Sequence, residues 1–454
     1  MKTTGVIFFP AFDWAISPTH PEREERLLYT RDQLFEEGIM DMPCVTEYHP
    51  RLATEKDVSR AHFCIPDIES RVTTAHMVSA GCALVMADAF MNREVDNAFA
   101  IIRPPGHHAM TVVHGNRGFC DINNEAVMVE YLRRTYGVKR LAVVDTDVHH
   151  GDGSQEIFWH DPDVLFISFH QDGRTLYPGS GFIDELGGPL AYGTTINIPM
   201  APRTTDEGIH YIMDNLVLPM LDEFKPEIII NSAGQDNHYS DPLANMSFTA
   251  QGYAILNQKL KPDIAVLEGG YSIETALPYV NMGIIMAMAG MDFSNLREPD
   301  YDPSRFKESI KNWTYIKSLV DHQLSVFRGR EAVVEKNRKQ DREFYGSSRS
   351  IFYDTEYLQE EQRLNLRLCP TCCGYRHISS GCAHRSGRNY SVECIAIPAA
   401  CCPDCLSRGL TEYDSLKKKK SGDHVYLQDR INDDYRTFVT KTGEETVVSG
   451  KSEE

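Results

Sequence analysis

Short apolar runs alternate with longer amphipathic stretches along about the first 290 residues. Five runs are rich in aliphatic and β-branched side chains, which predicts strands over residues 97–103, 140–147, 163–170, 227–234 and 263–270. The stretches between them predict helices over residues 68–92, 122–135, 205–223 and 249–261. Because apolar strands that alternate with helices form parallel sheets covered on both faces, the pattern predicts an α/β fold.

Polar side chains that can ligate metals or transfer protons follow each predicted strand. The segments are PPGHHA (104–109), DVHHGDG (147–153), HQDG (170–173), GQDNHYSDP (234–242) and GGYS (269–272). Ligands of parallel sheets bind just beyond the carboxyl ends of the strands. The sequence therefore predicts one site that is built from several loops.

Composition narrows the class of protein. A length of 454 residues predicts more than one structural unit, and a net charge of -19 disfavours nucleic acid and anionic membranes as partners. The amino-terminal apolar run is too short for a signal peptide, and no stretch approaches the length of a membrane span. We expect a cytoplasmic protein that binds neither membrane nor nucleic acid. The oligomeric state is left open.

The segment DVHHGDG at residues 147–153 predicts a metal site. Asp147 and His149 are two residues apart, so an extended backbone points both side chains to one side. Asp236 follows another predicted strand and supplies a third ligand. Three protein ligands with an open position are typical of catalytic zinc. Taken singly, each residue also fits a capped loop or strand end.

Acid–base groups are predicted beside this metal. His107 and His108 follow two prolines and a glycine, which favour a turn that presents both imidazoles. Asp145 and Asp152 flank the metal-binding segment and are the expected carboxylate partners of the two histidines. Tyr271 follows two glycines and is expected to donate a hydrogen bond to an oxyanion.

Together these motifs resemble the zinc-dependent histone deacetylase family, which includes acetylpolyamine amidohydrolases and acetoin utilisation proteins. The resemblance runs from about residue 5 to about residue 290 and includes HPEREERL at 20–27. Its six main segments are RPPGHHA (103–109), GFCDINNEAV (118–127), VVDTDVHHGDGSQEIF (143–158), YPGSG (177–181), SAGQDNHYSDPL (232–243) and LEGGYS (267–272). The resemblance implies an arginase-like deacetylase fold for residues 1–300.

The resemblance also implies a role for each matching residue. Asp147, His149 and Asp236 match the zinc ligands. The tandem histidines pair as His107 with Asp145 and His108 with Asp152, and Tyr271 polarises the substrate carbonyl. The implied lining of the acyl-lysine channel is Gly118, Phe119, Tyr177 and Gly270. A structural potassium ion is implied near Asp145, Asp147, His149 and Ser168.

Two positions depart from the family pattern. Gln235 precedes the third metal ligand where relatives commonly carry an apolar residue. The loop at residues 61–70 does not clearly preserve an aspartate that some relatives use to hold the peptide backbone, although Asp67 lies nearby. The loop leaves the preference for peptide substrates open, whereas Gln235 bears on packing or hydrogen bonding around the metal ligands and removes none of them.

Three functions remain in competition. The sequence favours a zinc-dependent amidohydrolase that removes acetyl groups from the side-chain amine of lysine in proteins, with an acetylpolyamine or small-acylamine amidohydrolase as the alternative. A non-catalytic protein that binds acyl-lysine is the third interpretation. A dinuclear manganese ureohydrolase is disfavoured, because the additional aspartate and histidine ligands are not found.

The chain changes character after residue 300. Residues 301–366 are charged and are interpreted as a helical connector, with GREAVVEKNRKQDREF at 329–344 and EYLQEEQRLNLRL at 356–368 as helices. Residues 411–454 are interpreted as a polar tail, with partial disorder as an open alternative.

Residues 367–410 are cysteine-rich and predict a zinc-ribbon-like module. Two CPxC turns present Cys369 with Cys372 and Cys402 with Cys405, which suits a tetrahedral structural zinc. Disulfides are the disfavoured alternative in a reducing compartment. A second zinc or a different pairing is left open by Cys373, Cys382, His384, Cys394 and Cys401. A protein partner is one role considered for this module.

Overall fold

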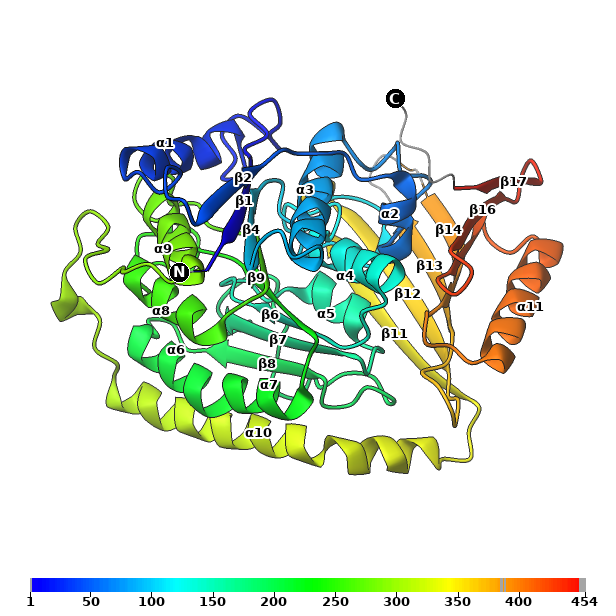
Figure 1. Ribbon diagram of the computed structural model, residues 1–454. Helices are drawn as coiled ribbons and strands as arrows, with labels where there is room; N and C mark the ends of the chain where they lie inside the picture. Colours follow the sequence, from blue (N-terminus) through cyan, green and yellow to red (C-terminus); the bar gives the residue numbers. More distant parts are fainter. Residues whose placement is uncertain (1, 384–386, 388, 449–454) are drawn as a thin grey trace.

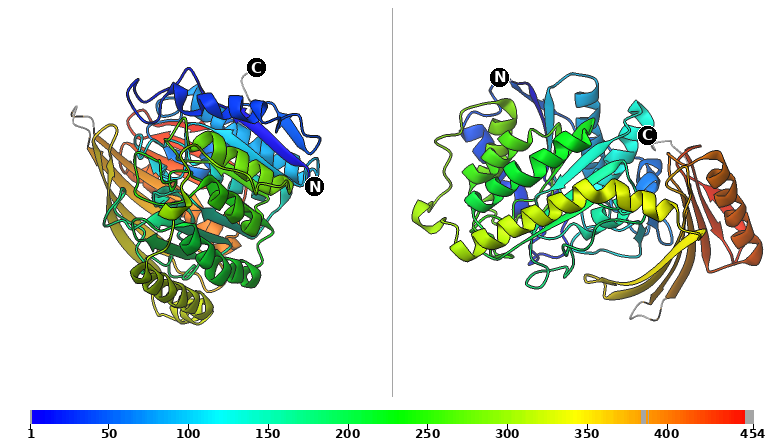
Figure 2. Two further views of the ribbon diagram at one scale, coloured as in Figure 1. Left: turned by 90° about the vertical axis from the view of Figure 1, so that its left-hand side faces the viewer. Right: turned by 90° about the horizontal axis from the view of Figure 1, so that it is seen from below.

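The structure is a computed structural model that describes residues 2–383, 387 and 389–448. Two large sheets organise these residues, one of eight strands and one of seven. In Figure 1 the eight-stranded sheet lies at the centre among helices, and the seven-stranded sheet, coloured yellow to red, stands at its side. The right-hand view of Figure 2 shows the same arrangement from below, with α11 (Pro403–Lys419) on the outside of the second sheet.

The eight-stranded sheet is parallel throughout. Its order is β2 (Val45–Tyr48), β1 (Thr4–Phe9), β4 (Asn97–Ile102), β10 (Ile264–Leu267), β9 (Ile228–Ala233), β6 (Leu141–Asp145), β7 (Val164–Gln171) and β8 (Thr195–Met200). The five strands predicted from apolar runs are confirmed as β4, β6, β7, β9 and β10. Every residue of β4, β6 and β7 is buried, which explains their nearly continuous apolar sequence.

Helices cover both faces of this sheet. Successive residues of β4 enter different cores, Phe99 on one side and Ala100 on the other. The first core includes η1 (Glu24–Leu27), α1 (Leu28–Glu36), α6 (Asp206–Ile212), a π turn at Met213–Val217, α7 (Leu218–Phe224), α8 (Ala250–Leu260), α9 (Leu277–Ala289) and α10 (Ile310–Arg338). The second includes α2 (Glu55–Ala61), α3 (Thr74–Met91), α4 (Asn124–Tyr136) and α5 (Asp152–Phe158). The α/β architecture is therefore confirmed.

One described helix, α3, is long and apolar enough to cross a membrane by length and composition alone. In this fold 61% of it is buried. Its alanine-rich surface packs against α4 and β4, as in the core helix of a globular domain.

The connector predicted after residue 300 is only partly helical. After the 3₁₀ turn η3 (Pro303–Arg305), α10 confirms a long helix, which runs along the lower edge of the molecule in Figure 1. The helix predicted from EYLQEEQRLNLRL is wrong, because β11 (Phe344–Tyr353) and β12 (Leu358–Arg367) form an antiparallel hairpin there. Burial in β12 alternates, with Glu360 inside and Glu361 outside, so its charged residues mark the solvent face of a strand.

The polar tail predicted for residues 411–454 instead forms regular structure in residues 411–448, the part of it that the structure describes. The seven-stranded sheet continues through β13 (Arg376–Ala383), β14 (Asn389–Ile397), β15 (His424–Asp429), β16 (Asp434–Val439) and β17 (Glu444–Val447). Only β14 and β15 pair in parallel, since α11 connects them. Val425 and Leu427 join Tyr413 and Leu416 in a small core under this helix. This apolar burial explains why the tail prediction is wrong.

The seven-stranded sheet packs directly on the first 300 residues. Tyr353 donates a hydrogen bond to the Val112 carbonyl at 2.9 Å, and Tyr426 donates to the Pro66 carbonyl at 2.7 Å. The short parallel pair of β3 (Phe63–Cys64) and β5 (Val112–Val113) shares a core with the sheet. The C-terminal region is therefore built onto the parallel-sheet domain.

Candidate active site

The three predicted metal ligands meet at the carboxyl edge of the parallel sheet. Asp147 and His149 follow β6, and Asp236 follows β9, the strand that pairs with β6. The His149 Nδ1 atom lies 3.1 Å from Asp147 Oδ1 and 3.0 Å from Asp236 Oδ2. The three ligand atoms lie within 4.8 Å of one another, and all three residues are buried. This group could hold one metal ion.

The surroundings of the three residues fit a divalent cation. Asp147 accepts a hydrogen bond from the Gly269 amide at 2.7 Å, and Asp236 accepts one from the Val148 amide at 2.7 Å, so backbone groups orient both carboxylates. Burial, reinforced by repulsion from Asp147, raises the pKa of Asp236. Crowded, buried carboxylates are costly unless a cation compensates them.

Both histidines of the tandem pair contact the predicted carboxylates. The His107 Nδ1 atom lies 3.1 Å from Asp145 Oδ2, and the His108 Nδ1 atom lies 2.7 Å from Asp152 Oδ1. The two imidazole centroids are 4.1 Å apart. Because each Nδ1 atom faces a carboxylate, each Nε2 atom is left for chemistry in the site.

The environments of the two histidines push their pKa values in opposite directions. Burial disfavours the charged form of His107, but Asp147 and Asp145 outweigh it and raise its pKa to about 10. Burial and the neighbouring His107 lower the pKa of His108 to about 3, although Asp152 opposes this change. A cation on Asp147 would weaken the attraction that raises the pKa of His107. The carboxylates by themselves thus favour a charged His107, whereas burial favours a neutral His108.

Tyr271 is held in a fixed position beside the metal group. Gly270 has a φ of 125°, a conformation that favours glycine, and the Tyr271 amide donates to Asp241 at 2.7 Å. Arg26 donates to the Gly270 carbonyl at 2.8 Å, and its guanidinium carbon lies 5.0 Å from the Tyr271 ring centroid. Burial raises the pKa of Tyr271 well above its usual value, so the phenol stays protonated and available as a donor.

The predicted channel residues gather around His108 and Tyr271. The Phe119 ring packs edge-on against Tyr271 with centroids 5.7 Å apart, and the Tyr177 ring packs edge-on against His108 at 5.2 Å. A Cβ atom on Gly118 would lie 2.3 Å from the His108 ring, so this position requires glycine. The aromatic walls suit the apolar stem of an acylated amine.

Two residues of this region were not expected from the sequence. Arg117 donates to Asp152, and also to the Phe352 carbonyl at 2.7 Å and the Tyr177 hydroxyl at 3.2 Å. Asp354, in the β11–β12 turn, accepts hydrogen bonds from the Gly118 amide at 2.9 Å and from Tyr177 at 3.2 Å. Arg117 directly precedes the GFC motif, so its position in the sequence indicates a place near the channel. Asp354 falls within residues 301–366, which the sequence predicts to be a connector, so no local pattern indicates its role.

The two departures from the family pattern have local explanations. The buried Gln235 side chain donates to Asn281, and its backbone amide donates to the Gly269 carbonyl at 2.9 Å. This residue therefore braces the GGY turn and displaces no metal ligand. Asp67 accepts from the Ser70 amide at 2.8 Å and lies in a cavity beside Tyr426, under the C-terminal sheet. The carboxylate that contacts the channel lining is that of Asp354.

A second group of metal-ligating side chains lies in the C-terminal region. The four cysteines of the CPxC turns lie within 4.8 Å of one another: Cys369, Cys372, Cys402 and Cys405. Sulfur atoms of Cys369 and Cys402 are 3.8 Å apart, and those of Cys372 and Cys405 are 3.5 Å apart. A tetrahedral ion with Zn–S bonds of about 2.3 Å needs S···S distances of about 3.8 Å. These distances fit a tetrathiolate zinc site and do not fit disulfides.

The remaining cysteines form no second metal group within the described part of the chain. Cys382 and Cys394 point into different cores, and Cys401 donates to the Gly374 carbonyl at 3.5 Å. His384 lies outside the described residues.

Comparisons with known proteins agree with this geometry. Residues 66–284 match the histone deacetylase domain family. A probable deacetylase of Archaeoglobus fulgidus is 44% identical over 325 residues, which cover 65% of this chain and 89% of the archaeal protein. Histone deacetylase 14, chloroplastic, of Arabidopsis thaliana is 39% identical over 213 residues, which cover 44% of this chain and 49% of the plant protein.

Two further matches come from a bacterium and from a solved structure. A histone deacetylase-like amidohydrolase of Pseudomonas aeruginosa is 34% identical over 254 residues, which cover 51% of this chain and 66% of the bacterial protein. The crystal structure of the HDA15 HD domain superposes with a TM-score of 0.62 at 26% identity, covering 75% of this chain and 99% of that domain. The arginase-like fold expected from the motifs is therefore confirmed, and the chain belongs to the histone deacetylase family of hydrolases.

Proposed function

We propose that the protein is a zinc-dependent amidohydrolase that removes acetyl groups from lysine side chains of proteins. The observation that carries this proposal is the convergence of a buried Asp147, His149 and Asp236 group, a tandem histidine pair and Tyr271 on one aromatic channel. Zinc held by this group would supply a Lewis acid that polarises the amide carbonyl and activates water.

The protein's own groups would move the protons. The neutral His108 accepts a proton from the attacking water at Nε2, and Asp152 stabilises the resulting imidazolium through Nδ1. His107, held by Asp145 through Nδ1, would supply the second imidazole of the pair beside His108. Tyr271 donates its hydroxyl proton in a hydrogen bond to the developing oxyanion, and the histidine pair returns a proton to the leaving amine.

A second candidate substrate class is an acetylated polyamine. The observation in its favour is Asp354, a partly exposed carboxylate beside the channel wall of Tyr177 and Gly118. A carboxylate at this place would attract the distal ammonium groups of a polyamine, and the net charge of -19 would add to that attraction. The same carboxylate would also accept a hydrogen bond from a peptide amide.

The substrate class is tested by comparing kcat/KM for acetyl-lysine peptides and acetylated polyamines with one zinc-loaded preparation. We expect a preference for the peptides of about a hundredfold, which corresponds to about 2.7 kcal/mol in transition-state binding. The reverse preference would assign the polyamine class and retain the hydrolase. Binding of acetyl-lysine peptide without turnover would support the non-catalytic interpretation and overturn the enzymatic one.

We also propose that the cysteine group binds a structural zinc. Four thiolates complete a tetrahedral shell and leave no open position for substrate or water. Arg367 donates to Cys405 Sγ at 2.9 Å, which offsets part of the negative charge of the tetrathiolate. The metal would clamp the end of β12 to the start of α11.

A further inference from the structure

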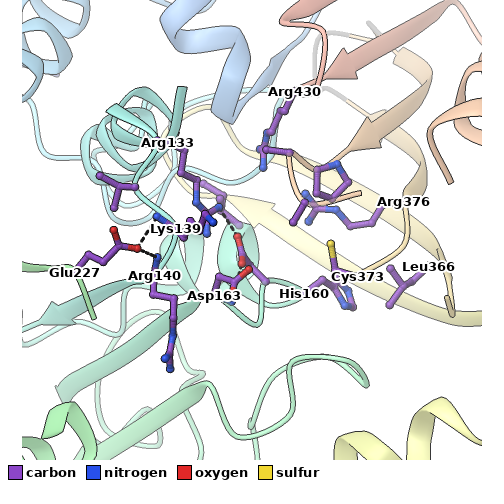
Figure 3. A pocket seen from close by; sticks show the side chains of 17 residues that line it. Arg133, Lys139, Arg140, His160, Asp163, Glu227, Leu366, Cys373, Arg376 and Arg430 are labelled. Carbon is purple, nitrogen blue, oxygen red and sulfur yellow. Dashed lines mark hydrogen bonds and ion pairs between the residues drawn. The ribbon is translucent and has the colours of Figure 1, made fainter. Parts of the chain in front are cut away.

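A separate cavity of about 450 Å³ lies between the parallel sheet and the C-terminal sheet (Figure 3). Its wall on the parallel-sheet side includes Arg140 and Asp163, which directly precede β6 and β7. The proposed catalytic group follows the opposite, carboxyl ends of β6 and β9. The cavity therefore lies at the other edge of the sheet from the channel and is a distinct site.

Arg376 contributes an uncompensated charge to this cavity. The residue begins β13 and is 3% exposed. Its side chain makes no hydrogen bond or ion pair with any residue that the structure describes, and its buried Nε atom has no partner. Figure 3 shows the side chain extending from the C-terminal sheet toward the space that the other labelled side chains surround. A buried guanidinium without a hydrogen-bond acceptor is costly.

A second arginine makes the environment of Arg376 more positive. Arg430 donates to Glu130 at 3.0 Å through Nη1 and to the Arg60 carbonyl at 2.8 Å through Nε, but its buried Nη2 atom has no partner. Burial and then repulsion from Arg430 lower the pKa of Arg376, although Glu156 and Asp161 oppose this change. Two guanidinium groups thus line the same cavity, and each has an N–H group without a hydrogen-bond acceptor.

Three of the nearby carboxylates already have other partners. Asp161 binds Arg133 at 2.5 Å, and Glu156 forms an ion pair with Arg349 at 2.7 Å. Glu227 accepts hydrogen bonds from the backbone amides of residues 139 and 140 at 2.9 and 3.0 Å. Asp163 also lines the cavity, but no hydrogen bond or ion pair joins it to Arg376 or Arg430, so the free donors of these two arginines have no acceptor within the described part of the chain.

We propose that this cavity binds a small organic anion, in which a phosphate or carboxylate group contacts Arg376 and Arg430 and an apolar body fills the remaining space. Guanidinium groups bind both oxyanions through paired N–H donors. The apolar part of the lining includes Val138, Leu366 and Pro398. The volume lies within the range of ordinary small-molecule sites.

Isothermal titration of the zinc-loaded full-length protein tests this site, with inorganic phosphate, phenyl phosphate and benzoate as probes at constant ionic strength. We expect phenyl phosphate or benzoate to bind at least about tenfold more tightly than inorganic phosphate, since the phosphate ion lacks an apolar body. The tighter of the two aromatic probes identifies the preferred anionic group. If inorganic phosphate binds as tightly as the aromatic probes, the proposal that an apolar body fills the cavity is wrong.

Arg376→Met is the informative variant, and Arg363→Met is its matched control because Arg363 is an exposed arginine of the neighbouring strand β12. The first change should weaken the aromatic probe at least about tenfold, and the second should leave its affinity unchanged. Arg376→Lys, which keeps the charge but loses the paired donors, should give an intermediate affinity. No binding of any probe to the parent protein, or equal binding to Arg376→Met, would refute the site.

Thermal unfolding without ligand separates this role from a structural one. Replacing an unpaired buried charge by an apolar side chain of similar length is expected to leave Tm unchanged or to raise it. A marked fall in Tm, or failure of Arg376→Met to fold, would show that Arg376 is satisfied within the protein and would overturn the proposal.

Discussion

The two large sheets each carry a group of metal-ligating side chains, but they hold these groups in different ways. In the parallel sheet, Asp147, His149 and Asp236 come from loops beyond buried strands and face a channel. In the C-terminal sheet, two cysteine turns close on one another between β12 and α11. Three mixed ligands leave room for chemistry, whereas four thiolates fill the shell. By number and position of ligands, the first group suits a catalytic metal and the second suits a structural metal.

The largest expected effect concerns the catalytic half of this comparison. His108→Ala should lower kcat by roughly 10² to 10⁴, because a proton-transfer group is lost while all three metal ligands remain. His107→Ala should have an effect in the same range. Steady-state kinetics and metal analysis measure both quantities, with His322→Ala on the exposed face of α10 as the control. Turnover equal to that of the parent in both variants would remove the histidine pair from the mechanism.

The next effect concerns the cysteine group. Replacing both Cys369 and Cys372 by serine should remove one zinc per chain and speed proteolysis around α11, since both cysteines belong to the small core under this helix. Activity should fall less than about tenfold, because Tyr353 and Arg117 still hold the β11–β12 hairpin against the channel. Cys401→Ser is the matched control and should keep the zinc. Complete loss of activity together with an unchanged fold would contradict the proposal that the cysteine group is structural only.

A cluster of one histidine and two carboxylates should make the stability of the C-terminal sheet depend on pH. His377 lies 2.7 Å from both Glu393 and Glu412, which joins β13, β14 and α11. Burial lowers the pKa of His377, but the two carboxylates outweigh it and raise the pKa to about 9. A folded pKa above the unfolded value means that this stabilisation is complete below about pH 6.5 and is lost as the pH rises through about 9.

The free energy involved is at most about 3 kcal/mol and should be smaller in practice. Urea denaturation at about pH 6 and about pH 10 measures it, and the pH dependence of the parent should be steeper than that of His377→Gln. Identical slopes for the two proteins would show that this charge cluster does not stabilise the C-terminal sheet.

The smallest expected effect concerns Asp354, which lies in the β11–β12 turn of the C-terminal sheet and contacts the channel wall of the parallel-sheet domain. Asp354→Ala should raise KM for acetyl-lysine peptides by about threefold to tenfold with little change in kcat, because the residue contacts the channel wall and not the reacting atoms. Glu361→Ala, on the exposed side of β12, is the matched control. A fall in kcat at constant KM would place Asp354 in the chemistry instead of the entrance.

The sequence predicted the parallel sheet well because its strands carry a simple signal. RLAVVDTD places an unbroken apolar run before a polar segment, so both β6 and the ligand-bearing loop could be located. The same reasoning brought Asp147, His149 and Asp236 together, since parallel strands end at one edge.

The C-terminal sheet was missed because its strands are half exposed and charged. EYLQEEQRLNLRL favours helix by composition, and only the alternation of buried Glu360 with exposed Glu361 identifies a strand. The contacts of Asp354 and the buried charge of Arg376 depend on how this sheet packs on the first domain. Such tertiary contacts leave no local pattern in the sequence.

The central claim is that the Asp147, His149 and Asp236 group holds the zinc that is needed for hydrolysis. Zinc analysis and acetyl-lysine hydrolysis of Asp147→Ala, measured beside the cysteine double variant, test it most directly. We expect each protein to lose one zinc per chain, but only Asp147→Ala should lose hydrolysis, by at least about 10³-fold. Full zinc content and parental activity in Asp147→Ala would contradict the account.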